Sequence, residues 1–341
     1  MPESREVSLI TVANLVKEFR RPKRFDGPLG GIRTLLTRQY VSKLAVDDIT
    51  FSVGEGELVG YLGPNGAGKS TTIKILTGIL QPTSGTVEVA GIVPWKERQR
   101  NARNIGVVFG QRTQLWWDLP LRDSLELIGK LYGVSKARHD ANTGQFIELL
   151  GLGSFLDTPV RQLSLGQRMR GDLAAAMLPG PRVLYLDEPT IGLDVVAKER
   201  IRDFIARLNR EEGTTVVLTT HDLDDVERLC RRIVLIDGGK VLFDDSVEKL
   251  KARYMPCRQL VMQLADGVDW QGIDMTGVTE TRVDDDASAG LIGLLFDPAF
   301  AQAADVIAAV TARHAVKDLS IVEPELEKVV HQIYAAREGI G

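Results

Sequence analysis

Apolar and polar residues follow changing rhythms along this chain, and each rhythm predicts a type of element. Alternation over residues 7–19 and 45–53 predicts half-buried strands, because successive side chains of a strand point to opposite faces. The apolar run 58–62 predicts a short buried strand that leads directly into glycines, whereas residues 72–80 have helical spacing. Further strands are expected at residues 85–89 and 105–109.

A helical rhythm then dominates from about residue 122 to residue 178. Apolar strand-like runs return later, each preceded by helical sequence, at residues 183–186, 216–219 and 233–236. Strands that alternate with helices predict a parallel sheet with helices on both faces. We therefore expect the helical block to be a subdomain inserted between elements of one sheet.

Past residue 240 the pattern changes again, to short strands mixed with two helices. Strands are expected at residues 258–264, 278–283, 291–296 and 317–322, and helices at residues 299–314 and 325–336. We expect two domains, residues 1–245 and 246–341, and the second of them is a small α+β module.

Composition narrows the class of protein. The chain has 341 residues, of which 44% are hydrophobic and 26% charged, values typical of a soluble globular protein. Its net charge of −4 argues against a general nucleic-acid binder. Cys230 and Cys257 form no CxxC pair and indicate ordinary thiols in a reducing compartment. The start has no signal-peptide core, and no apolar run is long enough to span a bilayer.

A basic, Gly-rich insertion occupies about residues 20–44. Two interpretations stay open: a loop solvated by water, which is the default for a run of charges, or a contact with lipid headgroups or a membrane subunit. Its cationic residues are Arg20, Arg21, Lys23, Arg24, Arg33, Arg38 and Lys43.

A phosphate-binding loop lies between the strand at 58–62 and the helix after it. The pattern GxxxxGK[ST] is made by Gly63, Pro64, Asn65, Gly66, Ala67, Gly68, Lys69 and Ser70, with Thr71 next. Backbone N–H groups and a helix N-terminus bind phosphate oxygens there. Lys69 adds a charge for the β- and γ-phosphates, and the Ser70 hydroxyl is a ligand for Mg²⁺. The loop alone does not distinguish kinases, GTPases and motor ATPases.

An acidic pair ends the apolar strand at 183–186. Asp187 and Glu188 are expected at the carboxyl edge of the sheet, where α/β proteins bind ligands. Asp187 is suited to hold Mg²⁺, and Glu188 to polarise the attacking water as a general base. One helical segment earlier stands a short Ser/Gly turn, residues 163–167.

With these motifs in this order, residues 7–245 resemble the nucleotide-binding subunit of an ABC (ATP-binding cassette) transporter. The resemblance implies an α/β fold: a P-loop NTPase with a RecA-like core, an antiparallel β subdomain and a helical subdomain at about 112–180. It also implies that the Ser/Gly turn, through Ser164, Gly166 and Gln167, contacts ATP held by a partner subunit. The usual turn is LSGGQ, and Leu165 replaces its first Gly.

The same resemblance assigns further site residues. Gln111 resembles the glutamine that reaches Mg²⁺ and the water, with Gly110 as an insertion and Gln114 as a weaker candidate. His221 resembles the switch histidine that contacts the γ-phosphate, and Asp194 links the two sites of the dimer. An aromatic side chain stacks on adenine; we choose Phe19, with Tyr40 as the rival and core packing as the alternative.

The resemblance also implies partners. Two chains close head-to-tail around two ATP molecules, and multi-span permease subunits complete the transporter at the cytoplasmic face of a bacterial membrane. Trp116 and Trp117 either face the transmembrane subunit or pack in the helical subdomain. The C-terminal module resembles the tails of ABC-2 type drug, polysaccharide and sodium exporters, which favours export over import. A soluble ABC ATPase acting on ribosomes or DNA is disfavoured, because the chain has one cassette and no long coiled coil.

Overall fold

The computed structural model describes residues 8–23, 39–110, 112–281 and 291–338. The chain divides into two compact units, Met1–Ser246 and Val247–Gly341, and each is described by itself. In the described part of the chain, no helix has both the length and the apolar character that a membrane crossing requires.

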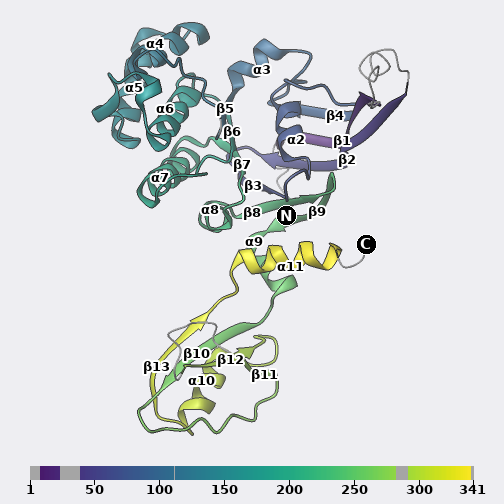
Figure 1. Cartoon of the computed structure of the whole chain (residues 1–341), viewed down its shortest axis with the longest axis vertical. Helices are drawn as coiled ribbons and strands as arrows, with labels where there is room; N and C mark the ends of the chain where they lie inside the picture. The colour runs from purple at the N-terminus through teal and green to yellow at the C-terminus, as the bar shows by residue number, and fades with distance from the viewer. Residues whose placement is uncertain (1–7, 24–38, 111, 282–290, 339–341) are drawn as a thin grey trace, which may run out of the picture. The chain divides into compact units, whose positions relative to one another are not determined.

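A six-stranded sheet forms the centre of the first unit (Figure 1). Its strand order is β5-β6-β7-β3-β8-β9, and every neighbouring pair is parallel except β8 and β9. The strands are β3 (Leu58–Leu62), β5 (Ile105–Phe109), β6 (Val183–Asp187), β7 (Thr215–Thr219), β8 (Arg232–Asp237) and β9 (Lys240–Ser246). The central strands are apolar throughout because both faces of the sheet are covered. The antiparallel β9 was not expected from the sequence.

A second, three-stranded antiparallel sheet has the order β2-β1-β4, made of β1 (Ser8–Pro22), β2 (Tyr40–Gly54) and β4 (Ser84–Val89). One hydrophobic core joins this sheet, the six-stranded sheet and helix α2 (Lys69–Leu76), with Ile49, Tyr61, Ile73 and Tyr185 among its members. Helix α2 therefore begins earlier and ends earlier than the predicted 72–80.

The basic insertion differs from the expected loop at both of its ends. Strands β1 and β2 stay paired as far as Arg20 opposite Ser42 and Pro22 opposite Tyr40, so they form an extended hairpin arm. Because the ladder continues, the side chains of residues 20–22 and 40–44 have the period of a strand. Residues 24–38 of the predicted insertion lie outside the described residues.

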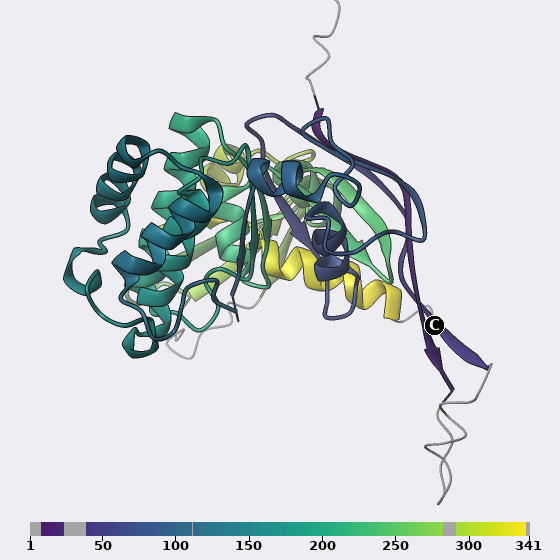
Figure 2. The same ribbon diagram turned by 90° about the horizontal axis from the view of Figure 1, so that it is seen from above.

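The helical block stands to one side of the six-stranded sheet, away from the β1–β2–β4 sheet, in both views of the molecule (Figures 1 and 2). It contains α4 (Leu121–Tyr132), α5 (Lys136–Leu149) and α6 (Leu165–Met177). Three other helices connect the strands of the sheet: α3 (Arg98–Asn104), which the sequence pattern did not predict, α7 (Val195–Glu212) and α8 (Leu223–Leu229).

The second unit contains a four-stranded antiparallel sheet of order β11-β12-β10-β13. Its strands are β10 (Arg258–Leu264), β11 (Val278–Thr281), β12 (Leu291–Phe296) and β13 (Val316–Val322), and its helices are α9 (Val247–Tyr254), α10 (Ala303–Thr311) and α11 (Leu326–Glu338). Leu260, Met262 and Phe296 pack with Val306 and Val310 of α10 in its core. The α+β pattern predicted for this region is therefore present, with α10 shorter than the predicted 299–314.

Candidate functional site

The phosphate loop connects β3 to α2, as its sequence predicts. Gly68 precedes α2 with φ 110°, a backbone conformation that L side chains avoid. A Cβ added there would lie 2.5 Å from the carbonyl oxygen of Ala45, so a larger residue would displace the loop. Below the loop, the buried Tyr61 hydroxyl lies 3.1 Å from Thr72 Oγ1 and ties β3 to α2. The local backbone is thus held in a form that only glycine permits at this position.

Lys69 is the cation of this loop. Its ammonium group donates to the carbonyl oxygens of Gly63 and Pro64, the latter at 3.2 Å. Burial lowers the pKa of Lys69, and the nearby carboxylates of Glu188 and Asp187 act in the opposite direction. A partly desolvated cation beside backbone N–H groups is a strong attractor for phosphate oxygens.

Ser70 and Asp187 meet across the sheet edge. Ser70 Oγ lies 3.4 Å from Asp187 Oδ2, and Thr219 Oγ1 donates to Asp187 Oδ1 at 2.5 Å. Thr219 is buried at the end of β7, directly opposite Asp187 in the parallel register. We did not identify Thr219 from the sequence. Its position at the end of the strand that leads to His221 is the signal that could have indicated it.

Glu188 and His221 form the second polar pair of the site. His221 Nδ1 lies 2.6 Å from Glu188 Oε2, and the His221 backbone N–H donates to the same oxygen at 3.3 Å. Glu188 has a left-handed φ of 58°, which is rare for a residue other than glycine and clusters at functional sites. Its backbone N–H donates to Thr219 O at 2.9 Å, which holds this conformation at the end of the strand.

Gly110 touches the backbone of the acidic pair. Its N–H donates to Asp187 O at 2.7 Å, and a Cβ at this position would lie 2.2 Å from Glu188 O. Gly110, which looked like an insertion in the sequence, is therefore the residue that allows the end of β5 to approach Glu188. Gln111, the next residue, lies outside the described residues.

Gly110→Ala is accordingly expected to displace Glu188 and to lower ATPase turnover at least about tenfold. A tenfold decrease corresponds to a rise of about 1.4 kcal/mol in the activation free energy. Steady-state phosphate release measures it. Gly144→Ala is the matched control, since a Cβ there meets no atom within 4 Å. Equal turnover of the Gly110 variant and the wild type would show that this close approach does not position Glu188.

A cavity of about 660 Å³ contains the phosphate loop, Asp187 and Glu188. Phe19 of β1 lines this cavity, and Lys17 Nζ lies 5.2 Å from the centre of its ring. Tyr40, by contrast, is 59% exposed and lies outside the lining. Of the two aromatic candidates, Phe19 is the one that shares a cavity with the phosphate loop. The cavity also has cationic walls, made by Arg21, Lys43, Lys74 and Arg112.

The Ser/Gly turn opens α6 with a complete capping box. Ser164 Oγ accepts from the Gln167 N–H, and the Gln167 side chain accepts from the Ser164 N–H. Leu165 is the first residue of α6 and has no left-handed backbone, so the missing glycine leaves the helix start intact. A Cβ on Gly166 would lie 3.1 Å from Ala197 Cβ, which places the turn against the start of α7.

Asp194 caps α7, and a buried ion pair lies behind it. Asp194 Oδ1 accepts from the Ala197 N–H at 2.8 Å. Further along, Arg202 Nε donates to Asp225 Oδ1 at 2.6 Å, and both side chains are buried. The Thr190 hydroxyl also donates to Asp225. Asp225 of α8 thus binds both Thr190 and Arg202 of α7, and it ties the segment between Glu188 and Asp194 to these two helices.

Gln114 is engaged elsewhere. Its side chain donates to Asp172 O, and its backbone N–H and the Thr113 hydroxyl donate to Asp172 Oδ1 at 3.0 and 2.9 Å. These contacts tie the segment after Gln111 to α6 and leave Gln114 outside the nucleotide cavity. Burial raises the pKa of Asp172 to about 6.

Asp172 therefore predicts a pH-dependent stability. Its folded-state pKa exceeds the ordinary value of 3.8, so its contribution is complete below about pH 4 and is lost as the pH rises through 6. The shift corresponds to about 3 kcal/mol in the free energy of unfolding. We expect the stability of the wild type relative to Asp172→Asn to fall by up to this amount between pH 4 and pH 7, measured by urea unfolding. A difference independent of pH would contradict the assignment.

Trp116 and Trp117 lie on the surface, 43% and 52% exposed. Arg168 stacks over the Trp117 ring at 5.4 Å from its centre. The alternative in which both tryptophans pack inside the helical subdomain is therefore wrong. Two exposed indoles next to each other are suited to contact another molecule.

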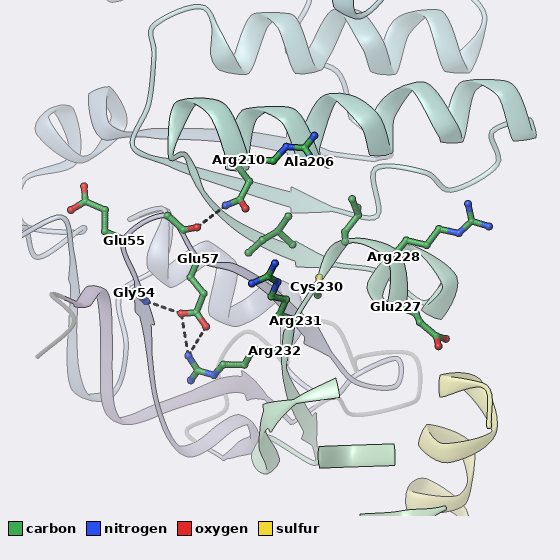
Figure 3. A pocket seen from close by; sticks show the side chains of 14 residues that line it. Gly54, Glu55, Glu57, Ala206, Arg210, Glu227, Arg228, Cys230, Arg231 and Arg232 are labelled. Carbon is green, nitrogen blue, oxygen red and sulfur yellow. Dashed lines mark hydrogen bonds and ion pairs between the residues drawn. The ribbon is translucent and has the colours of Figure 1, made fainter. Parts of the chain in front are cut away.

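A larger cavity, of about 1030 Å³, shares no lining residue with the cavity at the phosphate loop (Figure 3 shows this larger cavity). It borders Leu58 and Arg232, the first residues of β3 and β8, and so lies at the amino ends of the strands. Figure 3 shows Glu57 paired with Arg232 on its wall, at 3.0 Å. Ligands of α/β proteins bind at the carboxyl ends of the strands, so size alone does not mark the functional site.

Comparison with known proteins agrees with this geometry. The family model described as ABC transporter matches residues 46–191. Nod factor export ATP-binding protein I of Paraburkholderia xenovorans is 39% identical over 225 residues, which cover 64% of this chain and 72% of that protein. ABC transporter ATP-binding protein NatA of Bacillus subtilis is 32% identical over 206 residues, which cover 60% and 83%. The chain belongs to the ABC transporter ATP-binding family.

Solved structures support the same assignment. The ATP-binding subunit of an ABC transporter superposes with a TM-score of 0.61 at 25% identity, covering 72% of this chain and 93% of that one. A dimeric ATP-binding cassette in a post-hydrolysis state with ADP and Pi gives a TM-score of 0.58 at 26% identity, covering 70% and 98%. The predicted P-loop NTPase fold is confirmed. This chain is an ABC ATPase subunit, of a family that dimerises and works with membrane permease components.

Proposed function

We propose that this chain hydrolyses ATP to drive export through bacterial membrane subunits. The observation that carries the proposal is the convergence of Lys69, Ser70, Asp187 and Glu188 at one cavity, with His221 in contact with Glu188. Export is supported by relatives whose names state export or resistance to a compound. They are Nod factor export proteins, a daunorubicin resistance protein and a linearmycin resistance protein. A methionine import protein at 34% identity keeps the importer alternative open.

In this proposal, ATP binds along the cavity. Its adenine stacks on Phe19, and its phosphates accept hydrogen bonds from the backbone N–H groups of residues 63–71 and from Lys69. A Mg²⁺ ion fits the donors present, because protein-bound Mg²⁺ typically uses one or two carboxylates together with substrate phosphates. Ser70 and Asp187 would hold it, with Gln111 as a further ligand, and it would neutralise phosphate charge.

Glu188 is the proposed general base. Its carboxylate accepts the proton of the attacking water, and His221 holds that carboxylate through the contact at Nδ1. His221 is also the proposed contact to the γ-phosphate. The left-handed backbone at Glu188 directs the side chain toward the cavity at the end of β6. The pair therefore positions the base before substrate arrives.

The Ser/Gly turn serves the other chain. Ser164 and Gly166 stand at the N-terminus of a 13-residue helix, where the helix dipole favours an anion, and they are the proposed contacts to the partner's γ-phosphate. Gln167 supports Ser164 through the capping box. Asp194 lies near the same region and is proposed to link the two sites. The dimer is proposed to be a head-to-tail homodimer at the cytoplasmic face of the membrane.

Trp116 and Trp117 are the proposed anchors for a permease subunit. Both are exposed, aromatic and adjacent, which is the composition of interface hot spots. Co-purification with a multi-span membrane protein tests the coupling. Stimulation of the ATPase by ribosomes or DNA, with no effect of a membrane protein, would favour the non-transport alternative instead.

A mixing experiment tests the division of roles between chains. Lys69→Ala and Ser164→Arg are each expected to abolish hydrolysis, whereas their mixture recovers up to about a quarter of wild-type turnover, because half of a statistical set of dimers has one intact composite site. Steady-state phosphate release before and after mixing measures this. If Ser164 served the ATP of its own chain, no dimer in the mixture would contain an intact site, and no activity would return.

A further inference from the structure

Strand β13 forms one open edge of the sheet in the second unit. The strand order ends with β13, which pairs with β10 alone among the described strands (Figure 1). The pairing is regular over five consecutive residues, from Asp318 to Val322, with no bulge inside that stretch. A long, regular edge strand presents unpaired N–H and C=O groups that another strand can use. Nothing in the sheet order places a described strand on its outer side.

The edge is also more apolar than a protected edge. Leu319, Ile321 and Val322 are 38%, 40% and 42% exposed. Leu319 pairs with Met262 and Ile321 pairs with Leu260, and these two β10 residues are buried under α10. Because paired residues share a face, Leu319 and Ile321 extend the core face of the sheet beyond the part that α10 covers. Natural edges are usually blunted by charge, proline or bulges over such a stretch.

The sequence of this strand is complementary to itself in the antiparallel direction. If two copies pair about Ser320, then Leu319 lies opposite Ile321, twice by symmetry. Both residues lie within the regular stretch, so they share the face that carries Leu260 and Met262. An apolar cross-strand pair then lies on each side of the axis, an arrangement that stabilises the contact between two strands.

We propose that β13 pairs with β13 of a second copy of this chain, in antiparallel register about Ser320. The two four-stranded sheets then become one eight-stranded sheet, and this contact forms without bound nucleotide. A second copy is the occupant because the family dimerises, so a partner strand is already present at high effective concentration. This contact is additional to the ATP-dependent closure of the cassettes and holds the two chains together when the cassettes separate.

Site-specific cross-linking of the full chain tests the register. Ser320→Cys, in a Cys257→Ser background, places two cysteines opposite each other at the two-fold axis. The Cα–Cα distance between directly opposed residues of antiparallel strands falls in the range that a disulfide requires. Without nucleotide, we expect oxidation to link at least ten times more of this variant than of Asp266→Cys, an exposed turn residue of the same unit. A mixture of Leu319→Cys and Ile321→Cys should link more strongly than either variant alone.

A control in the Glu188→Gln background separates this contact from the cassette dimer. The Ser320→Cys substitution should leave the ATP-dependent dimer of that variant intact. Equal cross-linking of Ser320→Cys and Asp266→Cys, while ATP still assembles the Glu188→Gln dimer, would overturn the β13 contact and leave the proposed ATPase untouched. Cross-linking of Ser320→Cys to a membrane subunit instead of to itself would overturn it as well.

Discussion

Glu188→Gln is expected to lower ATPase turnover by about 10²- to 10⁴-fold, the range for removal of a general base. ATP binding should persist, because the phosphate loop, Lys69 and Phe19 are unchanged. Gln keeps the shape of Glu and an oxygen that accepts from the His221 N–H, so the contact between these residues survives while the basic site is lost. A protein that binds ATP without cleaving it should also accumulate as a closed dimer.

Phosphate release, nucleotide binding and sedimentation in the presence of ATP measure these three consequences. Glu211→Gln is the matched control, since Glu211 forms an exposed pair with Arg207 on α7 and lies outside the nucleotide cavity. Turnover of Glu188→Gln at the wild-type rate would remove Glu188 from the role of base. Loss of ATP binding in the same variant would instead indicate that its carboxylate supports the binding site.

The second large effect is on stability. Asp225→Ala is expected to lower the free energy of unfolding by about 3 kcal/mol or more, because it leaves a buried guanidinium without its main partner. Arg202 is 9% exposed and Asp225 1% exposed, and their closest atoms form a short ion pair. Asp224, at 3.0 Å from Arg202 but about half exposed, compensates only in part. Urea unfolding monitored by circular dichroism measures the change.

The double variant Arg202→Met/Asp225→Leu is the informative comparison. It removes both charges together and should recover much of the lost stability, since apolar replacements of buried ion pairs are often neutral. The Thr190 hydroxyl then loses its acceptor, so the segment from Glu188 to Asp194 should become less ordered and ATPase activity should stay reduced. Equal stability of Asp225→Ala and the wild type would show that solvent already reaches Arg202.

Local chemistry explains which features the sequence predicted well. Glycine spacing, the cationic lysine and the strand that ends in Asp187 and Glu188 are properties of short segments, so the phosphate loop and the acidic pair could be placed without a fold. The alternation of strands and helices likewise predicted the parallel sheet. Edge elements such as α3 and β9 were missed, because short segments carry little periodicity.

Contacts between distant segments required the tertiary structure. Thr219 reaches Asp187 only because β6 and β7 are neighbours in parallel register, and Gly110 matters only because β5 ends against Glu188. The choice of Phe19 over Tyr40 likewise depends on how far the β1–β2 arm extends beside the cavity.

By itself, then, the sequence determined the fold class, the nucleotide chemistry and the family of this protein. The tertiary structure decided which residues support that chemistry, which aromatic side chains reach solvent and which strand is left at an open edge. The physical reason is that a motif depends on spacing along the chain, whereas burial, register and hydrogen-bond partners depend on where the rest of the chain returns.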